Sequence, residues 1–394
     1  MLSSFERDVL SLIKAGLLNV KASVSEDFDF EAAYTLACEQ QIVPIVYYGA
    51  STLDGFDKLD VSQKFLNMTA KCTFHSENQL SELEEVFRRF NSEGVEHLRL
   101  KGTVLKKMYP YPEMRLMGDA DIFIRLEQYE LVKRIFTELG YTYLLESDHE
   151  ITWKKENGML IELHKHVMPT YNKDFHDYYK DSWDRLTRVD GSCEYKMSPS
   201  DMFVYLFAHY ARHYRDGGVG IKFIVDLYVM MNKMDGLDYG YIEAELDKLS
   251  LTAFWQNTKM LIDVWFNGAS GNEITDFMSA RMFNSATYGR ALDKLVASGA
   301  KASGDNGSAS DVRKKRVRAS LFPPVKTMSY MYPVLKKAPI LYPFVWLHRA
   351  FCLVFLRKDK IKQRLDSNKQ ITDEKIDKYK AELDFVGLSF AKEE

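Results

Sequence analysis

Two aspartates separated by one residue, Asp119 and Asp121, are the side chains in this sequence best suited to carry out chemistry. The residues that follow them, IFI, are apolar and β-prone, so the pair should lie in a strand. Because side chains of a strand alternate between its two faces, both carboxylates should point the same way. Two neighbouring carboxylates repel each other unless a cation bridges them, and Mg²⁺ prefers carboxylate and phosphate oxygens. The pair, preceded by Gly118, therefore predicts a metal-assisted phosphoryl-transfer site.

A second element, upstream of the aspartates, is suited to binding an anion. Residues 95–100 predict a strand that ends at Leu100 and runs through Lys101, Gly102 and Thr103 into a short helix. A strand-to-helix turn of this kind exposes backbone N–H groups and a helix N-terminus, both of which attract phosphate.

The order LKGT, then YPYP, then Arg115, then DADI resembles the nucleotidyltransferase superfamily of DNA polymerase β. More narrowly, it resembles a large bacterial family of uncharacterised nucleotidyltransferases. Helices before this core, an ELH strand after it and a helical region with a histidine-rich helix and an Asp-Leu helix extend the resemblance over most of residues 25–350. The resemblance implies an α+β fold, in which a small mixed-sheet nucleotidyltransferase core is flanked by N- and C-terminal helical regions.

The same resemblance implies a metal site. Asp119 and Asp121 match the paired metal ligands of the superfamily, and Glu162, in MLIELH, matches its third carboxylate on a neighbouring strand. The implied cofactor is Mg²⁺, as two ions, with Mn²⁺ as the alternative. Glu162 would also help to deprotonate the attacking hydroxyl. A solvent-facing strand acid is the structural alternative for Glu162.

The resemblance also implies a triphosphate site. Gly102 and Thr103 match the turn that grips the β- and γ-phosphates, although this chain has a single glycine where many relatives have two small residues. Lys101 and Arg115 would neutralise the triphosphate, Arg115 as a two-pronged donor and Lys101 as a point charge. Because Lys101 precedes the turn, the alternative is that it points away from the site.

The implied reaction moves an NMP from an NTP to an acceptor hydroxyl and releases pyrophosphate. The sequence does not identify the acceptor, which could be a sugar, a small metabolite, an RNA end or a protein. Two alternatives remain: a catalytically inactive NTP-binding or regulatory protein of the same fold, and a toxin-like nucleotidyltransferase that modifies tRNA or protein.

Histidines supply further candidates for substrate contact. His164 and His166 have the spacing of two ligands on one strand face, which could suggest zinc, but no third soft ligand lies nearby, so a structural or substrate-contact role is preferred. His209 and His213 lie at i and i+4 of a predicted helix, without the glutamate of a zinc-protease motif. For these two, helix packing is the alternative to a contact with base or acceptor.

The elements that must position these residues divide the chain into five parts. We expect an N-terminal helical region (1–90), the α/β core (91–195), a helical substrate-binding region (196–296), a flexible basic linker (297–320) and a C-terminal helical segment (321–394). In the core, strands are predicted at 95–100, 120–124, 141–145, 152–154 and 159–164, with a helix at 128–139. Ser198, Pro199 and Asp201 form a capping box that opens the next helix, 202–214. Further along, Lys222 and Asp226 have the spacing of a helical salt bridge.

Two segments near the C-terminus suggest partners. The basic run RKKRVR, which opens with Arg313 and closes with Arg318, indicates either a solvated helix start or a contact with RNA or phosphate. Residues 338–356 are apolar enough to suggest a membrane span, but His348, Arg349 and two prolines interrupt them. A central arginine costs about 3 kcal/mol on insertion, so a buried or interfacial helix is favoured and no stable span is expected.

The bulk composition fits a folded protein of more than one structural unit. The chain has 394 residues, 46% hydrophobic and 28% charged, and a formal charge of only −3. Such a balance excludes a global attraction to nucleic acid or anionic membranes, so any such partner must use a local patch. Four scattered cysteines and an N-terminus that lacks the features of a signal peptide favour the cytoplasm.

Overall fold

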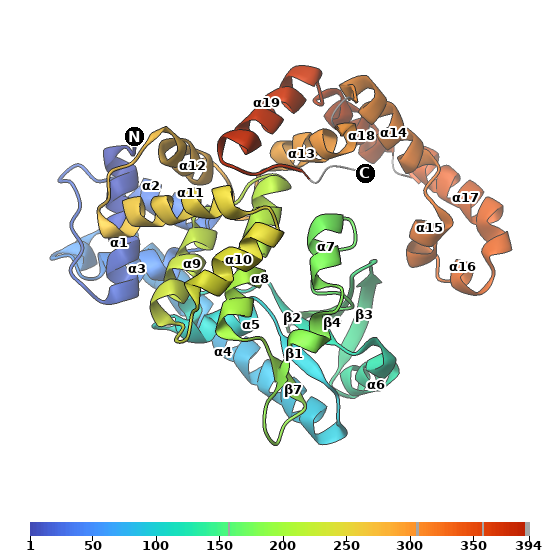
Figure 1. Cartoon of the computed structure of the whole chain (residues 1–394), viewed down its shortest axis with the longest axis horizontal. Coiled ribbons are helices and arrows are strands. Elements are labelled where there is room, and N and C mark those ends of the chain that lie inside the picture. The colour runs from blue at the N-terminus through green and yellow to red at the C-terminus, as the bar shows by residue number, and fades with distance from the viewer. Residues whose placement is uncertain (157, 305–306, 357, 391–394) are drawn as a thin grey trace. The chain divides into compact units, whose positions relative to one another are not determined.

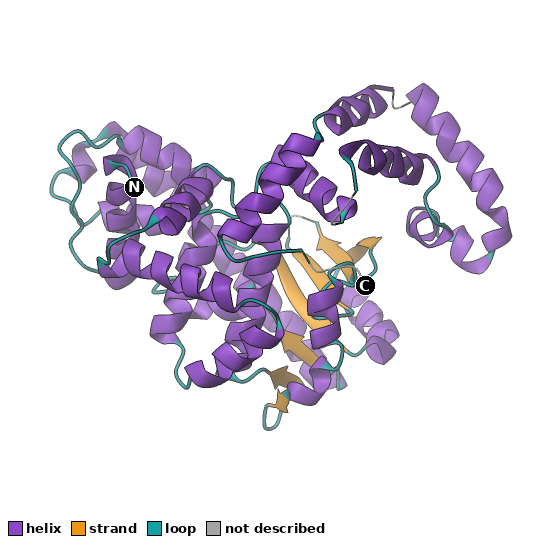
Figure 2. Ribbon diagram, turned by 45° about the horizontal axis from the view of Figure 1, so that its top comes forward, coloured by secondary structure: helices purple, strands orange, loops and turns teal. Residues whose placement is uncertain are grey.

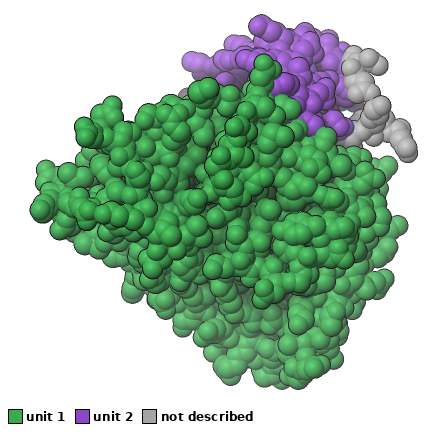
Figure 3. Space-filling model, turned by 60° about the vertical axis from the view of Figure 1, so that its left-hand side comes forward, with its two compact units in different colours: residues 1–212, 219–288 green, residues 213–218, 289–394 purple. Residues whose placement is uncertain are grey.

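The computed structural model describes residues 1–156, 158–304, 307–356 and 358–390 (Figure 1). The chain divides into two compact units, one of residues 1–212 and 219–288 and one of residues 213–218 and 289–394 (Figure 3). All strands of the described residues form one sheet in the first unit, and helices make up most of the rest (Figure 2). The fold is therefore α+β, as the sequence predicts.

A seven-stranded mixed sheet has the strand order β3-β4-β5-β2-β1-β7-β6. β2 pairs in parallel with β5, and β1 in parallel with β7, whereas the other neighbours are antiparallel. The strands are β1 (His97–Arg99), β2 (Asp119–Ile124), β3 (Tyr141–Glu146), β4 (Glu150–Lys155), β5 (Leu160–His164), β6 (Thr187–Arg188) and β7 (Glu194–Lys196). The first five lie where apolar residues predict them. β6 and β7 are too short to show a pattern, and the sequence does not predict them.

Two helices, α4 (Asp60–Glu93) and α6 (Tyr129–Glu138), cover one face of the sheet. Their apolar side chains form a single cluster with alternate residues of β2, β4 and β5; among its members are Phe87, Phe90, Ile135, Phe136, Ala120, Ile122, Ile124, Trp153, Ile161 and Leu163. Because alternate side chains of a strand point to opposite faces, the remaining residues of β2 and β5 face away from this core.

The other helices of the first unit form the predicted N-terminal and central helical regions. Gln40 ties the two regions together, because its buried side chain donates to the Met282 and Ser285 carbonyls and accepts from the N–H of Ile221. The N-terminal set is α1 (Ser4–Leu18), α2 (Phe30–Glu39), α3 (Val43–Ala50) and η1 (Phe56–Lys58). The central set is α8 (Pro199–Arg215), α9 (Ile221–Lys233), α10 (Tyr239–Lys248), α11 (Thr252–Ile262), η6 (Asp263–Asn267) and α12 (Glu273–Phe283).

The Ser198 N-cap of the predicted capping box is confirmed at the start of α8. The Asp201 N–H donates to the Ser198 hydroxyl at 3.0 Å, and that hydroxyl donates to the Asp201 carboxylate at 2.6 Å. Short helices connect the strands of the core, and three of them lie between β1 and the aspartates of β2. They are α5 (Gly102–Leu105), η2 (Lys106–Met108), η3 (Pro112–Met114), η4 (Leu126–Gln128), α7 (Lys173–Tyr179) and η5 (Ser182–Arg185).

The second unit is helical, and it differs from the prediction of a flexible linker at 297–320. α13 (Ala291–Ser303) and α14 (Ala309–Leu321) occupy most of that range, although residues 305–306 lie outside the described ones. Small residues explain the difference, because Ala297 and Ala300 are buried and Gly299 lies against the Ile371 side chain. A stretch rich in Gly, Ser and Ala can therefore be a close-packed helix instead of a loop.

The rest of the second unit begins with α15 (Val325–Met331), α16 (Val334–Lys337) and η7 (Pro339–Leu341). It continues with α17 (Tyr342–Phe351), η8 (Cys352–Leu356), α18 (Lys358–Lys369) and α19 (Asp373–Phe385). The apolar segment 338–356 is helical, as predicted, but several of its large side chains are exposed. Within the described residues, no helix has the length and apolar character needed to cross a bilayer.

Candidate active site

The parallel pairing of β2 with β5 brings three carboxylates to one face of the sheet. Asp121 is the register partner of Glu162, and Asp119 precedes Asp121 by one alternation of the strand. Their immediate neighbours Ala120 and Ile161 are fully buried in the core below α4 and α6. The three acids therefore lie on the opposite face, in the arrangement that strand alternation predicts.

Asp121 is the centre of this cluster. Its Oδ1 accepts a hydrogen bond from Lys101 Nζ at 2.6 Å and lies 2.7 Å from His164 Nε2. The same histidine nitrogen is 4.0 Å from Glu162 Oε2. The side chain of Asp121 is 5% exposed and that of Glu162 is 23% exposed, so Glu162 is the more accessible of the two to solvent. Lys101 points toward the acids, which decides the question of its direction that the sequence leaves open.

Burial and neighbouring charges shift the pKa values of the three carboxyl groups in opposite directions. Burial, followed by the charges of Asp119, Asp121 and Glu150, raises the pKa of Glu162 to about 8. Burial and the Asp121 charge also raise the pKa of Asp119, although Lys101 opposes them. Burial alone would raise the pKa of Asp121 too, but the Lys101 charge and the hydrogen bond from His164 hold it well below its usual range. Asp121 is thus a permanent anion, whereas Glu162 carries a proton near neutral pH.

His164 is held as a neutral ring. Burial, followed by the Lys101 charge, lowers its pKa despite the neighbouring Asp121. A neutral imidazole carries one proton, and the contact with Asp121 assigns that proton to Nε2. The other ring nitrogen, Nδ1, is buried and has no hydrogen-bond partner among the described residues. His164 therefore orients Asp121 without adding positive charge.

The turn between β1 and α5 puts Lys101 beside the acids. The Thr103 N–H donates to the Leu100 carbonyl at 3.2 Å, and Lys101 has φ 47° and ψ −119°. These values describe a type II′ turn, whose first central position favours glycine. A Cβ on Gly102 would lie 2.9 Å from Met117 Sδ, so the turn packs closely on the segment before β2. The Thr103 hydroxyl donates to the Leu100 carbonyl at 2.5 Å and closes the turn.

Comparison with known proteins agrees with this geometry. The model of the family described as uncharacterised nucleotidyltransferase matches residues 26–267. The chain belongs to this family. No curated protein and no solved structure matches the chain. The matched range contains the sheet, the Lys101 turn and the central helices through η6, so the acidic cluster is part of the nucleotidyltransferase region.

In this nucleotidyltransferase, Arg115 is buried and fixed by α9. Its Nε donates to Asp226 Oδ1 at 2.6 Å, and the Tyr109 hydroxyl donates to the same oxygen at 2.6 Å. The predicted pairing of Lys222 with Asp226 does not form; Lys222 Nζ donates instead to the Leu116 carbonyl at 2.6 Å and to Gln41. The Arg115–Asp226 and Lys222–Leu116 contacts bind α9 to the loop that leads into β2.

The remaining residues that the sequence predicts for the site are Gly118, His209 and His213, and their surroundings differ. Gly118 is exposed, and a Cβ there would meet no atom within 4 Å, so the approach to Asp119 is open. His209 is buried on α8, with its ring stacked near Phe223 at 6.2 Å between centroids. His213, on the same helix, is half-buried and belongs to the second unit. The surroundings of His209 therefore agree with a role in helix packing, the alternative that the sequence analysis gives to a contact with base or acceptor.

Two charged residues near the cluster, Lys222 and Glu150, are not predicted from the sequence to act on it. Lys222 is buried, and its charge lowers the pKa of Asp119, while the Glu150 charge contributes to the raised pKa of Glu162. Glu150 lies on β4, which pairs with β5, so the strand assignment supplies a signal for it. Lys222 gives no such signal, because it comes from a helix about a hundred residues further along the chain.

A divalent cation fits the donors that the structure brings together. Asp121, Glu162 and His164 each offer one ligand atom, and these atoms all lie within 4.8 Å of one another. The two carboxylates are ligands that Mg²⁺ and Mn²⁺ prefer, whereas an imidazole is more typical of zinc or iron sites. Asp119 lies on the same face but is not part of this set. His164 is a candidate ligand, a role that the sequence analysis sets aside because no third soft ligand lies nearby.

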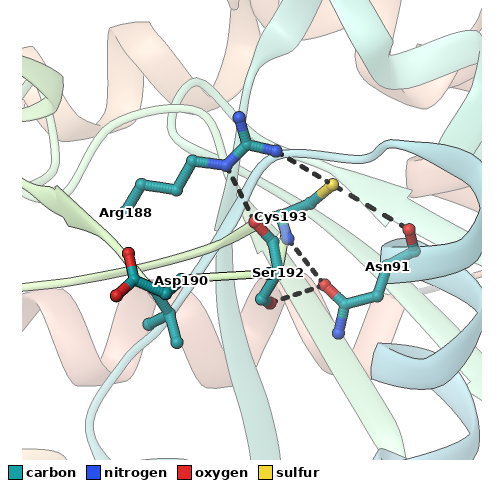
Figure 4. Close-up of a pocket in the computed structure, with 7 residues that line it drawn as sticks. Asn91, Arg188, Asp190, Ser192 and Cys193 are labelled. Atoms are coloured by element: carbon teal, nitrogen blue, oxygen red, sulfur yellow. Dashed lines mark hydrogen bonds between the residues drawn. The ribbon is translucent and has the colours of Figure 1, made fainter.

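A separate cavity of about 300 Å³ lies at the β6–β7 turn (Figure 4). Asn91 Oδ1 accepts hydrogen bonds from the Cys193 N–H and the Ser192 hydroxyl, both at 2.8 Å, and Arg188 Nε donates to the Ser192 carbonyl. These bonds, which Figure 4 shows as dashed lines, fasten the turn to the end of α4. The cavity is therefore a feature of hairpin packing, distinct from the acidic cluster.

Proposed function

We propose that this chain is a metal-dependent nucleotidyltransferase of the polymerase β superfamily, from a bacterium and acting in the cytoplasm. It moves an NMP from an NTP to an acceptor hydroxyl. The acceptor oxygen bonds to the α-phosphorus as the bond to the β-phosphate oxygen breaks, and pyrophosphate leaves.

The observation that carries this proposal is the register of β2 against β5. Glu162 lies directly across from Asp121, and Asp119 lies on the same face. Three buried or half-buried acids held this close are costly for stability, so they are retained for what they bind.

Asp119, Asp121 and Glu162 would hold the metal, with His164 orienting Asp121 or serving as a further ligand. Two Mg²⁺ ions, or Mn²⁺, would supply charge neutralisation at the attacking and leaving oxygens. Glu162, on the exposed side of the cluster, would in its deprotonated form accept the proton of the acceptor hydroxyl at its carboxylate.

The triphosphate would lie along the turn at residues 101–103. Gly102 and Thr103 would contact the phosphates, with the Gly102 N–H as the donor, because the N–H and the hydroxyl of Thr103 already donate to the Leu100 carbonyl. Lys101 would exchange its contact with Asp121 for a phosphate oxygen once the acids are neutralised. Arg115, held by Asp226, contributes its charge from behind the turn.

The substrate would be closed in by the helical regions. We propose that residues 196–296 select base and acceptor, with His209 and His213 as contacts, and that the acceptor is a sugar, a small metabolite, an RNA end or a protein.

The test is label transfer from each α-labelled NTP in the presence of Mg²⁺ and a host lysate. Asp119→Ala/Asp121→Ala should lower transfer and pyrophosphate release by a factor on the order of 10² to 10³, and Asp54→Asn, at an exposed ion pair, should leave them unchanged. Equal transfer by the wild type and the double variant would contradict the assignment.

A second candidate is an NTP-binding protein without turnover. Two observations favour it: Lys101 is paired with Asp121, and Arg115 is paired with Asp226. Mg²⁺-dependent NTP binding by the wild type, with no pyrophosphate release from any of the four NTPs, would support this candidate over the transferase.

A further inference from the structure

The second unit contains a long stretch without acidic residues. Residues 312–358 include no Asp or Glu but eleven Lys or Arg, although the whole chain has 53 basic and 56 acidic residues. The stretch lies outside residues 26–267, the range that the family model matches. It forms the orange elements α14 to α17 and η8 of Figure 1. A local positive surface of this size attracts an anionic partner that the net charge of the protein does not.

One face of α17 is both apolar and exposed. Phe344, Leu347 and Phe351 are 70%, 59% and 57% exposed. At 3.6 residues per turn, these three side chains fall within about 60° of one another around the helix. Ile340, just before the helix, is 85% exposed, and Phe355, just after it, is 62% exposed. A contiguous set of large apolar side chains in water usually marks a binding surface.

The opposite side of α17 is fixed to the rest of its unit. The Tyr342 hydroxyl donates to the Pro323 carbonyl at 2.6 Å, and Trp346 Nε1 donates to the Leu321 carbonyl at 2.6 Å. The Trp346 ring also stacks on Phe322, with centroids 5.2 Å apart and planes 7° from parallel. These contacts hold the helix with its apolar face toward solvent.

Two basic side chains precede the apolar face. Lys336 and Lys337 end α16, with Lys337 three residues before Ile340, and both are exposed. The sequence from Lys336 to Phe355 contains no Asp or Glu. Exposed lysines next to exposed apolar side chains form an amphipathic cationic surface.

We propose that this surface, the α17 apolar face with Lys336 and Lys337 of α16, docks on an anionic lipid bilayer. The apolar side chains enter the boundary between headgroups and acyl chains while the lysines contact lipid phosphates, so the helix lies in the plane of the membrane. RNA would match the positive charge, but its phosphate backbone gives the apolar side chains of Ile340 and Leu347 no apolar surface to contact. The lipid surface is the partner that uses both properties.

Flotation of the full-length protein on vesicles tests this proposal, with one set of phosphatidylcholine and one containing about 30% phosphatidylglycerol. The wild type should float with the anionic vesicles alone. Phe344→Ser should weaken binding by at least about tenfold. Lys336→Gln/Lys337→Gln should weaken it by about 30-fold and reduce its salt sensitivity.

Matched controls separate the surface from general stickiness. Phe74→Ser changes a phenylalanine of α4 that is also 70% exposed, and Lys58→Gln/Lys71→Gln removes two exposed charges of the first unit. Both should bind like the wild type. Failure to float with anionic vesicles, equal binding to neutral vesicles, or unchanged binding of Phe344→Ser would overturn the proposal. The proposal would also be overturned if the wild type did not float but associated with itself, and if Phe344→Ser abolished that association.

Discussion

Replacing Glu162 by glutamine should make the metal-free protein more stable while removing nucleotidyl transfer. Glu162 is 23% exposed and lies among Asp119, Asp121 and Glu150, whose charges oppose its ionisation. Glutamine keeps the size of the side chain but carries no charge at any pH. The repulsion therefore disappears with little change in packing.

The magnitude follows from the pKa of Glu162, which burial and neighbouring charges raise from 4.5 to about 8. Below about pH 4.5 the group is protonated in both the folded and the unfolded protein, so it contributes no difference. Between these values the folded state keeps a proton that the unfolded state has lost, and stability falls by about 1.4 kcal/mol per pH unit. The variant avoids this loss, and its advantage reaches roughly 5 kcal/mol above pH 8, of which about 2 kcal/mol arises between pH 6.5 and 8.

The assay is urea unfolding of wild type and variant in EDTA, at intervals from pH 6.5 to 8.5. Comparing the two proteins at each pH removes the contribution of His164 and other groups that titrate in both. Glu127→Gln, an exposed glutamate of η4, serves as the matched control and should track the wild type at every pH. Transfer activity with Mg²⁺ is measured on the same samples.

A difference in unfolding free energy that stays flat across this range, or a variant less stable than the wild type at pH 8.5, would refute the reasoning about the cluster. Full transfer activity in the variant would refute the role of Glu162 in the reaction. The two readouts are independent, so either conclusion can fail alone.

Three further outcomes are expected. Asp226→Asn leaves the buried Arg115 guanidinium without its anion and should lower the free energy of unfolding by about 3 to 5 kcal/mol in urea titrations; a loss below about 1 kcal/mol would contradict a buried ion pair. Gly102→Ala places a Cβ 2.9 Å from Met117 Sδ and should cost about 1 kcal/mol of stability. It should also weaken NTP binding, measured by fluorescence titration. Unchanged binding would argue against the turn as the phosphate site. Mg²⁺ should raise the Tm of the wild type but not that of Asp121→Asn, and an equal rise in both would place the metal elsewhere.

Much of the fold can be predicted from periodicity. β2 and β5 are short apolar runs in which the acids occupy alternate positions, so one pattern predicts both the strand and the shared face of Asp119 and Asp121. The helix at residues 298–303 cannot be predicted in the same way. Its Gly and Ser residues disfavour a helix while its Ala residues favour one, so local preferences conflict, and burial of Ala297 and Ala300 decides the outcome.

In the site, too, the features that depend on local spacing can be predicted from the sequence, and the contacts between distant residues cannot. Glu162 follows from strand alternation and family resemblance, whereas the pairing of Arg115 with Asp226 joins residues 111 positions apart. Local spacing offers Lys222 as the partner of Asp226, and only the packing of α9 against the loop before β2 shows that Arg115 takes that place. Nor can sequence decide that Lys101 reaches Asp121, since that depends on the type of turn.

That turn has a consequence for the history of the family. Lys101 has a positive φ of 47° in a position that suits glycine, and such a conformation costs about 1 to 3 kcal/mol for a residue with a side chain. Glycine at this position would relieve the strain and would lose only the charge beside Asp121. A lineage that no longer transfers nucleotides is therefore expected to drift toward glycine at this position, so the residue that descendants carry at position 101 would record which of them still have the activity.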